Sequence, residues 1–192
     1  MQPPWHPETV RRLVAAHTPR TQPAAGRIPA AVLVPLLWPR GRLSLLFIRR
    51  THTLSDHPGQ IAFPGGRIEP ADPAPAAAAL REAHEEIGLP PERVELIGRL
   101  DDHPTRTTKY HLTPVVGIVT RPPAFAPDPR EVAEVFMVPF EHLTDPANQV
   151  THRVEHQSRE VVTPGYRWHG DVIWGATATI LQNLIEVLRP GR

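Results

Sequence analysis

Apolar residues near the start of the chain fall into two nearly uninterrupted runs. The first extends from Ala30 to Trp38, and the second from Leu43 to Arg49, with Arg40-Gly41-Arg42 as a turn between them. Short apolar runs without polar alternation are typical of strands that are buried on both faces. The two runs therefore predict a pair of core strands joined as a hairpin.

Three other segments carry apolar residues at helical spacing, residues 8–17, 73–87 and 177–188. The second has the clearest ends. Asp72 is placed to cap it, Pro73 suits the first helical position, and Gly88 followed by Pro90 ends it. Further short apolar runs predict strands at residues 61–63, 94–100, 112–119, 132–138 and 167–174. Mixed strands and helices of this kind predict an α/β fold around a mixed sheet.

The length of 192 residues favours a single domain over residues 1–192, with an N-terminal helix and loop in 1–29 and the core in 30–188. The absence of cysteine excludes disulfides, thiolate metal sites and a cysteine nucleophile. A net charge of +1 gives no general attraction to nucleic acid. The sequence shows no signal-peptide pattern and no apolar run long enough to cross a membrane, so we expect a cytoplasmic protein without a membrane partner.

Carboxylates are concentrated on the predicted helix 73–87. Glu82 and Glu86 are four residues apart and lie one above the other on a helix, with Glu85 beside them. Arg81 is placed to pair with Glu85. Hard divalent cations such as Mg²⁺ prefer oxygen ligands of this kind, together with phosphate oxygens. Gly65-Gly66, shortly before the helix, permits close approach of a ligand to the main chain.

The segment from Gly66 to Leu89 resembles the Nudix box, whose pattern is Gly, five residues, Glu, seven residues, then Arg-Glu-apolar-x-Glu-Glu-x-Gly-apolar. The first acid is Asp72, or it has shifted to Glu69, and the spacing to Arg81 is one residue longer than usual. Since the extra residue falls in the loop before the helix, we expect the helix carboxylates to keep their arrangement.

The resemblance implies the Nudix fold, an α/β/α sandwich around a mixed β-sheet, and a Mg²⁺- or Mn²⁺-dependent hydrolase. It implies that Glu82 and Glu86 bind the metal and that Glu85 is a further ligand or acts through water. It also implies that Arg81 orients the carboxylates and that the backbone around Gly66 contacts metal or phosphate.

Three further stretches resemble the coenzyme A pyrophosphatase branch of the family. They are residues 45–66, which run into the Gly-Gly pair, residues 100–117, and residues 173–178. The branch usually has a basic residue where this chain has Ser55, and the neighbouring arginines are placed to compensate. Anionic phosphates require Arg or Lys at fixed positions. The candidate substrate-binding residues are Arg49, Arg50, His57, Gly66, Thr105, Arg106 and Lys109, whereas Trp174 is interpreted as a core residue.

The implied reaction is attack by water on a pyrophosphate, which for coenzyme A gives 4′-phosphopantetheine and 3′,5′-ADP. Glu85, Glu131 and Glu134 are alternative general bases. Another nucleoside diphosphate derivative, such as ADP-ribose or a dinucleotide, is an alternative substrate, and a non-catalytic nucleotide-binding regulator is an alternative function. The expected partner is a small nucleotide, not nucleic acid or membrane, and the chain is expected to be a monomer or homodimer.

Overall fold

The computed structural model describes residues 5–53, 58–105, 109–156 and 159–189. Its helices and strands, in chain order, are α1 (Pro7–Ala16), β1 (Ile28–Leu37), β2 (Ser44–Arg50), β3 (Ile61–Ala62), β4 (Gly65–Arg67), α2 (Pro75–Ile87), β5 (Val94–Arg99), β6 (His103–Pro104), β7 (Tyr110–Val119), β8 (Val132–Pro139), α3 (Phe140–Thr144), β9 (Gln149–His156), β10 (Arg159–Trp168), β11 (Asp171–Trp174) and α4 (Gly175–Val187).

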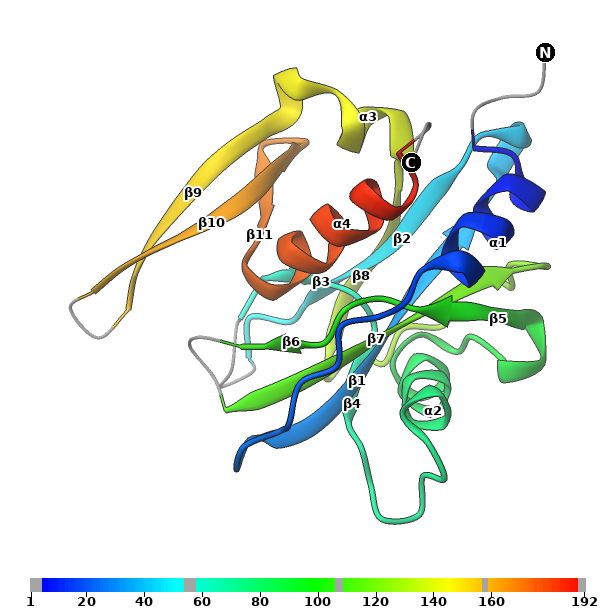
Figure 1. Ribbon diagram of the computed structural model, residues 1–192, viewed down its shortest axis with the longest axis horizontal. Coiled ribbons are helices and arrows are strands. Elements are labelled where there is room, and N and C mark those ends of the chain that lie inside the picture. Colours follow the sequence, from blue (N-terminus) through cyan, green and yellow to red (C-terminus); the bar gives the residue numbers. More distant parts are fainter. Residues whose placement is uncertain (1–4, 54–57, 106–108, 157–158, 190–192) are drawn as a thin grey trace.

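Strand β1 is the centre of the larger sheet, whose main path is β3-β2-β1-β7-β5 (Figure 1). It pairs in parallel with β7 and antiparallel with β2 and β4. Strands β6 and β8 extend the sheet along β7 and β2. The expected hairpin of β1 and β2 and the mixed character of the sheet are confirmed.

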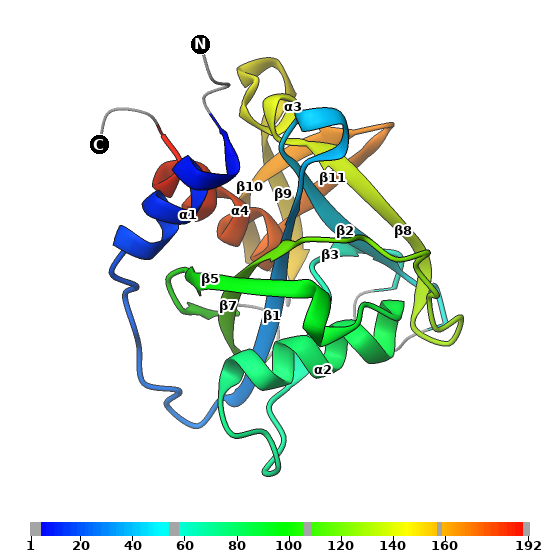
Figure 2. The same ribbon diagram turned by 90° about the vertical axis from the view of Figure 1, so that its right-hand side faces the viewer.

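Both faces of β1 are buried, which explains its continuous apolar run. Ala31, Leu33 and Leu37 pack into the cluster that includes the apolar side of α2. Val34 and Leu36 pack into the opposite cluster, with residues of α1 and α4. Helices therefore cover the sheet on both sides (Figure 2), and the predicted α/β/α sandwich is confirmed.

The predicted start of the second helix is wrong by two residues. Helix α2 begins at Pro75, with Ala74 at the N-cap position. The Asp72 carboxylate does not cap it but accepts a hydrogen bond from the backbone of Glu69 at 2.8 Å. At the other end, Gly88 adopts a left-handed conformation with φ +66° and ends the helix as predicted.

A separate three-stranded antiparallel sheet of β9, β10 and β11 follows the main sheet. Strand β9 and most of β10 lie where no strand was expected, and the strand expected at 167–174 is the end of β10, a turn and β11. The hairpin of β9 and β10 projects from the body of the molecule (Figure 1). Within the described residues, no helix is long and apolar enough to cross a membrane.

Candidate functional site

A cavity of about 740 Å³ opens beside the N-terminal part of β1. This volume is within the usual range for small-molecule sites. Segments far apart in the chain meet there, among them the Gly-Gly segment at β4, one face of α2, the beginning of β7 with the residues before it, and the β9–β10 hairpin with the start of α4. Residues far apart in the sequence therefore share one cavity.

The two glycines before α2 allow the helix to lie close to the sheet. A side chain on Gly65 would collide with the backbone of β1, and one on Gly66 would lie 2.5 Å from the Glu82 carboxylate. The Gly65 N–H also donates to Glu86 Oε2 over 2.9 Å. Gly66 thus leaves space for Glu82, and Gly65 donates a hydrogen bond to Glu86.

Glu82 and Glu86 face the cavity, as their spacing predicts. Glu86 is 3% exposed. Burial raises its pKa to about 8, and the nearby Glu82 and Glu131 act in the same direction, against the Gly65 hydrogen bond and the charge of Arg50. Burial also raises the pKa of Glu82, although Arg81 opposes the shift. Both shifts disfavour the charged forms of these carboxylates unless a cation is bound beside them.

Arg81 connects the carboxylates to the loop before the helix. Its Nη1 donates to Glu82 at 2.9 Å and to Glu85 at 3.1 Å, and its Nε and Nη2 bind the two Asp72 oxygens. The hydrogen bond from Arg81 lowers the pKa of Asp72. The side chain of Glu85 is 57% exposed and does not line the cavity, so its role as a metal ligand stays a prediction.

Glu131 is the distant acid that reaches the cavity. Its loop is fastened to the end of α2, since the N–H groups of Ala126 and Asp128 donate to the carbonyls of Ile87 and Glu86 at 3.0 and 2.9 Å. The Glu131 N–H then donates to the Asp128 carbonyl. Glu134, in contrast, pairs with Arg49 and does not line the cavity.

The adjacent residues Arg49 and Arg50 have different surroundings. Arg49 binds Glu134 at 3.2 Å and Asp171 at 2.8 Å, and it does not line the cavity. Arg50 lines the cavity near Glu86, and its buried Nε has no hydrogen-bond partner among the described residues. Arg50 is therefore the better placed of the two to bind an anion inside the cavity.

Some of the other predicted substrate-binding residues line the cavity and some do not. Gly66 and Thr105 line the cavity, Lys109 does not, and His57 and Arg106 lie outside the described residues. The interpretation of Trp174 as a core residue is wrong, because it is half-buried and lines the cavity.

Arg67, Glu69 and Tyr110 also line the cavity, and Arg67 and Tyr110 were not among the predicted site residues. Arg67 directly follows the Gly-Gly pair, and that position was a signal available in the sequence. Its guanidinium lies over the Tyr110 ring, 5.8 Å from the centroid. Tyr110 reaches the site through the parallel pairing of β1 with β7, which a single sequence does not reveal.

The oxygen-rich lining fits a hard divalent cation. Glu86 is buried and Glu82 is partly buried, and burial raises the pKa of both carboxylates. A cation bound between them would favour their charged forms. Among the described residues, no three His, Asp or Glu side chains lie close enough to enclose a metal ion. A cation held by two carboxylates, water and substrate phosphate matches the coordination that Mg²⁺ usually has in proteins.

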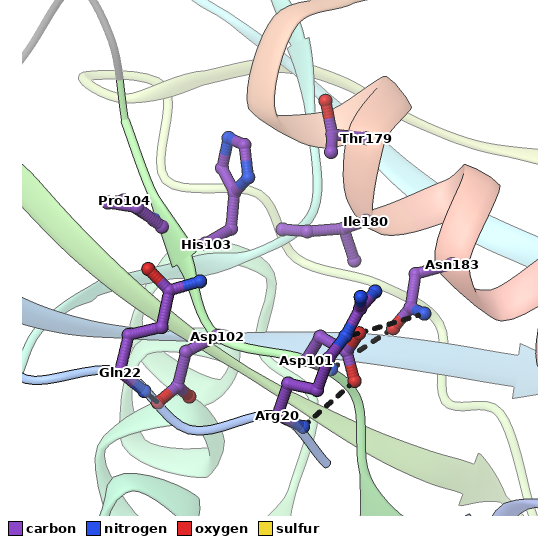
Figure 3. Close-up of a pocket in the computed structure, with 9 residues that line it drawn as sticks. All are labelled: Arg20, Gln22, Asp101, Asp102, His103, Pro104, Thr179, Ile180 and Asn183. Carbon is purple, nitrogen blue, oxygen red and sulfur yellow. Dashed lines mark hydrogen bonds and ion pairs between the residues drawn. The ribbon is translucent and has the colours of Figure 1, made fainter.

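A second cavity of about 280 Å³ adjoins the first, because His103, Thr179 and Ile180 line both. Figure 3 shows Arg20 and Gln22 from the α1–β1 linker opposite Asn183 of α4, with Asp101 between them. Burial opposes ionisation of Asp101, but hydrogen bonds from the Arg20 backbone, the Arg20 side chain and His17 together lower its pKa. The linker is thereby fastened to the segment that carries His103 and Thr105 into the main cavity.

Comparison with known proteins adds to this geometry. The model of the NUDIX domain family matches residues 27–160. A protein from Enterobacter sp. (strain 638), named as the uncharacterized Nudix hydrolase NudL, is 39% identical over 82% of this chain and 81% of its own. Its namesake from Photorhabdus laumondii is 35% identical over 82% and 83%.

Solved structures agree with the fold. A MutT/nudix family protein from Enterococcus faecalis superposes with a TM-score of 0.54 over 94% of this chain and 73% of its own, at 15% identity. A NUDIX hydrolase from Alicyclobacillus acidocaldarius gives a TM-score of 0.51 over 60% and 80%, at 20% identity. At these identities the likeness concerns the fold alone.

Proposed function

The chain belongs to the Nudix hydrolase family, and we propose that it is a Mg²⁺- or Mn²⁺-dependent pyrophosphatase acting on coenzyme A or a close derivative. One observation carries the proposal. The carboxylates of Glu86, which is buried, and Glu82, which is partly buried, share a cavity with Arg50, a cation whose Nε has no hydrogen-bond partner among the described residues. Cleavage of a pyrophosphate requires carboxylates that bind a metal ion and a cationic side chain that binds phosphate.

In this proposal Glu82 and Glu86 hold the divalent cation. When bound, the cation neutralises phosphate oxygens and lowers the pKa of bound water. Arg81 keeps Glu82 in place through their 2.9 Å contact, and Arg50 binds and orients the substrate's pyrophosphate. Water adds to one phosphorus, the bond from that phosphorus to the bridging oxygen breaks, and that oxygen leaves with the other phosphate.

Glu131 takes the proton of the attacking water. Of the three acids considered as the base, it alone lines the cavity. Glu85 is bound by Arg81 and Glu134 by Arg49. The fastening of its loop to α2 holds Glu131 at a fixed place relative to Glu86, which favours proton transfer by a positioned carboxylate.

The choice of coenzyme A rests on the three stretches that resemble the coenzyme A pyrophosphatase branch. The size of the cavity, about 740 Å³, supports an extended ligand. Hydrolysis of coenzyme A would release 3′,5′-ADP and 4′-phosphopantetheine.

The test is incubation of the purified protein with coenzyme A and with ADP-ribose, each with Mg²⁺, Mn²⁺ or EDTA, followed by chromatography of the products. We expect 3′,5′-ADP from coenzyme A in the presence of metal and none with EDTA. The Glu86→Gln variant should lose turnover and stay folded, whereas Glu92→Gln, at an exposed position outside the cavity, should be as active as the wild type. Cleavage of ADP-ribose alone would keep the reaction and remove the substrate assignment.

A further inference from the structure

The two sides of the main cavity differ in charge. The side formed by β2, β4, α2 and the loop before β8 contributes Arg50, Arg67, Glu69, Glu82, Glu86 and Glu131. The described lining residues of the other side, which come from the β9–β10 hairpin, the end of β11 and α4, include no Lys, Arg, Asp or Glu. A ligand that fills the cavity therefore meets a charged wall and an uncharged wall.

The uncharged wall continues the hydrophobic core along one strand. Val162, Pro164 and Tyr166 alternate along β10, so their side chains lie on the same face of the small sheet. Tyr166 is 4% exposed and belongs to the core cluster, whereas Val162 and Pro164 line the cavity. Val162 is 44% exposed, one of the most exposed large apolar side chains in the described residues. An apolar stripe thus passes from the core into the site.

The small sheet holds this wall in a fixed position. Strand β10 pairs with β9 along the wall, where Val162 lies opposite Arg153 and Pro164 opposite Thr151, and β11 pairs with the end of β10 from Gly165 to Trp168. Arg153 pairs with Glu160 and does not line the cavity. The Gly175 N–H, at the start of α4, contacts Thr163 Oγ1 at 3.4 Å, and the rings of His152 and Trp174 pack with centroids 5.1 Å apart. These contacts hold the wall in place before a ligand binds, and a preformed apolar surface favours apolar ligand groups.

We propose that the β10 wall, formed by Val162 and Pro164, receives an uncharged and partly apolar arm attached to the substrate's diphosphate, and that Val162 sets the preference for that arm. This inference rests on the proposed function, since the charged wall must hold the pyrophosphate. A second nucleotide would bring further phosphate charge to a wall with no cation among its described residues. A substrate with a long uncharged arm places no phosphate against this wall.

The test uses the Val162→Asp variant of the full chain, with Met137→Asp on β8 as the matched control. Met137 is 40% exposed and lies outside the cavity. The two substrates are coenzyme A, which has a long uncharged arm, and ADP-ribose, which has a ribose in its place. We expect Val162→Asp to lower kcat/KM for coenzyme A about tenfold more than for ADP-ribose, the scale of losing one apolar contact in a binding pocket. Met137→Asp should change neither.

An equal fall for both substrates, or no fall for either, would overturn the role of Val162. Calorimetric binding in EDTA of coenzyme A and of adenosine 3′-phosphate 5′-diphosphate, which keeps the diphosphate and lacks the arm, provides a second readout that does not depend on turnover. We expect the wild type to bind coenzyme A more tightly and Val162→Asp to lose that preference. If the wild type cleaves neither substrate but keeps the binding preference, the pyrophosphatase proposal fails and the arm site stands. If it binds the two ligands equally, the arm site is wrong.

Discussion

Arg81 and Asp72 form a two-point ion pair across the loop that precedes α2, with Nε and Nη2 at 3.2 and 3.0 Å from the two carboxylate oxygens. This pairing favours Asp72 over Glu69 as the first acid of the box pattern, although it is not a glutamate. The extra residue of the box lies between them, before the helix begins at Pro75. The loop accommodates the extra residue, and Arg81 still binds Asp72.

The Asp72→Asn variant should weaken this pair and loosen Arg81, which also holds Glu82. We expect kcat/KM to fall about tenfold, as is usual when a group that orients a metal ligand is altered, with little change in melting temperature. Glu69→Gln is the comparison, because it leaves both partners of the pair unchanged. A larger loss in Glu69→Gln than in Asp72→Asn would assign the first acid to Glu69.

Gly66→Ala should impair activity far more than stability. The added methyl group would lie 2.5 Å from the Glu82 carboxylate, so the carboxylate must move. A displacement of about 1 Å in a catalytic group costs roughly a hundredfold in rate. Gly117→Ala is the matched control, since its methyl group would meet Val94 in the core at 2.5 Å. It should lower the melting temperature and leave kcat nearly unchanged, and the reverse pattern would contradict our account of Gly66.

Arg50→Ala should change substrate binding, whereas Arg49→Ala should change stability. Arg50 lines the cavity, and loss of one charge-assisted contact to phosphate should raise KM about tenfold. Arg49 binds Glu134 and Asp171 outside the cavity, so its removal should lower stability and leave KM close to the wild-type value. Steady-state kinetics and thermal melts of both variants measure this, and an unchanged KM in Arg50→Ala would remove it from phosphate binding.

Asp101→Asn should cost stability in a pH-dependent way. Arg20 and His17 hold the pKa of Asp101 below its ordinary value despite burial. A lowered pKa gives stabilisation that is present above the ordinary carboxyl pKa of about 4 and is lost as the pH falls through the folded-state pKa. Urea unfolding should show a deficit of about 1–2 kcal/mol at pH 7 that shrinks below pH 4. Glu160→Gln, in an exposed pair with Arg153, should show almost none. A deficit that persists unchanged at pH 3 would exclude the ion pairs as its source.

Local patterns in the sequence were sufficient where one element determines the geometry. The apolar run of β1 predicted burial on both faces, and the spacing of Glu82 and Glu86 predicted that both would face the same side. Alternation along β2 predicts that Arg49 and Arg50 point to opposite faces. Which of them enters the cavity was not predictable, because the pairing of β2 with β8 shifts register between these two residues. Such an irregularity redirects side chains through tertiary pairing, and nothing in a run of apolar residues reveals it.

The β9–β10 hairpin was missed for a different reason. Its residues mix charges with valines, and Pro164 lies within β10, where proline usually argues against a strand. Because the hairpin supplies one wall of the cavity, half of the site was absent from the sequence-based prediction. The alternation of Val150, His152 and Val154 was the signal available, since period-two spacing is typical of a strand.

Backbone hydrogen bonds hold residues 126–128 against the end of α2. The position of Glu131 therefore does not depend on the length of the loop that precedes residue 126. Residues 122–124 lie between the Arg121 carbonyl, which accepts a hydrogen bond from Arg93, and Phe125, which packs against the core. Insertions or deletions in 122–124 therefore leave the anchored turn that begins at Ala126 in place. This stretch is where homologues can change loop length, acquire a new surface or accept a grafted peptide without displacing Glu131 from its place beside α2.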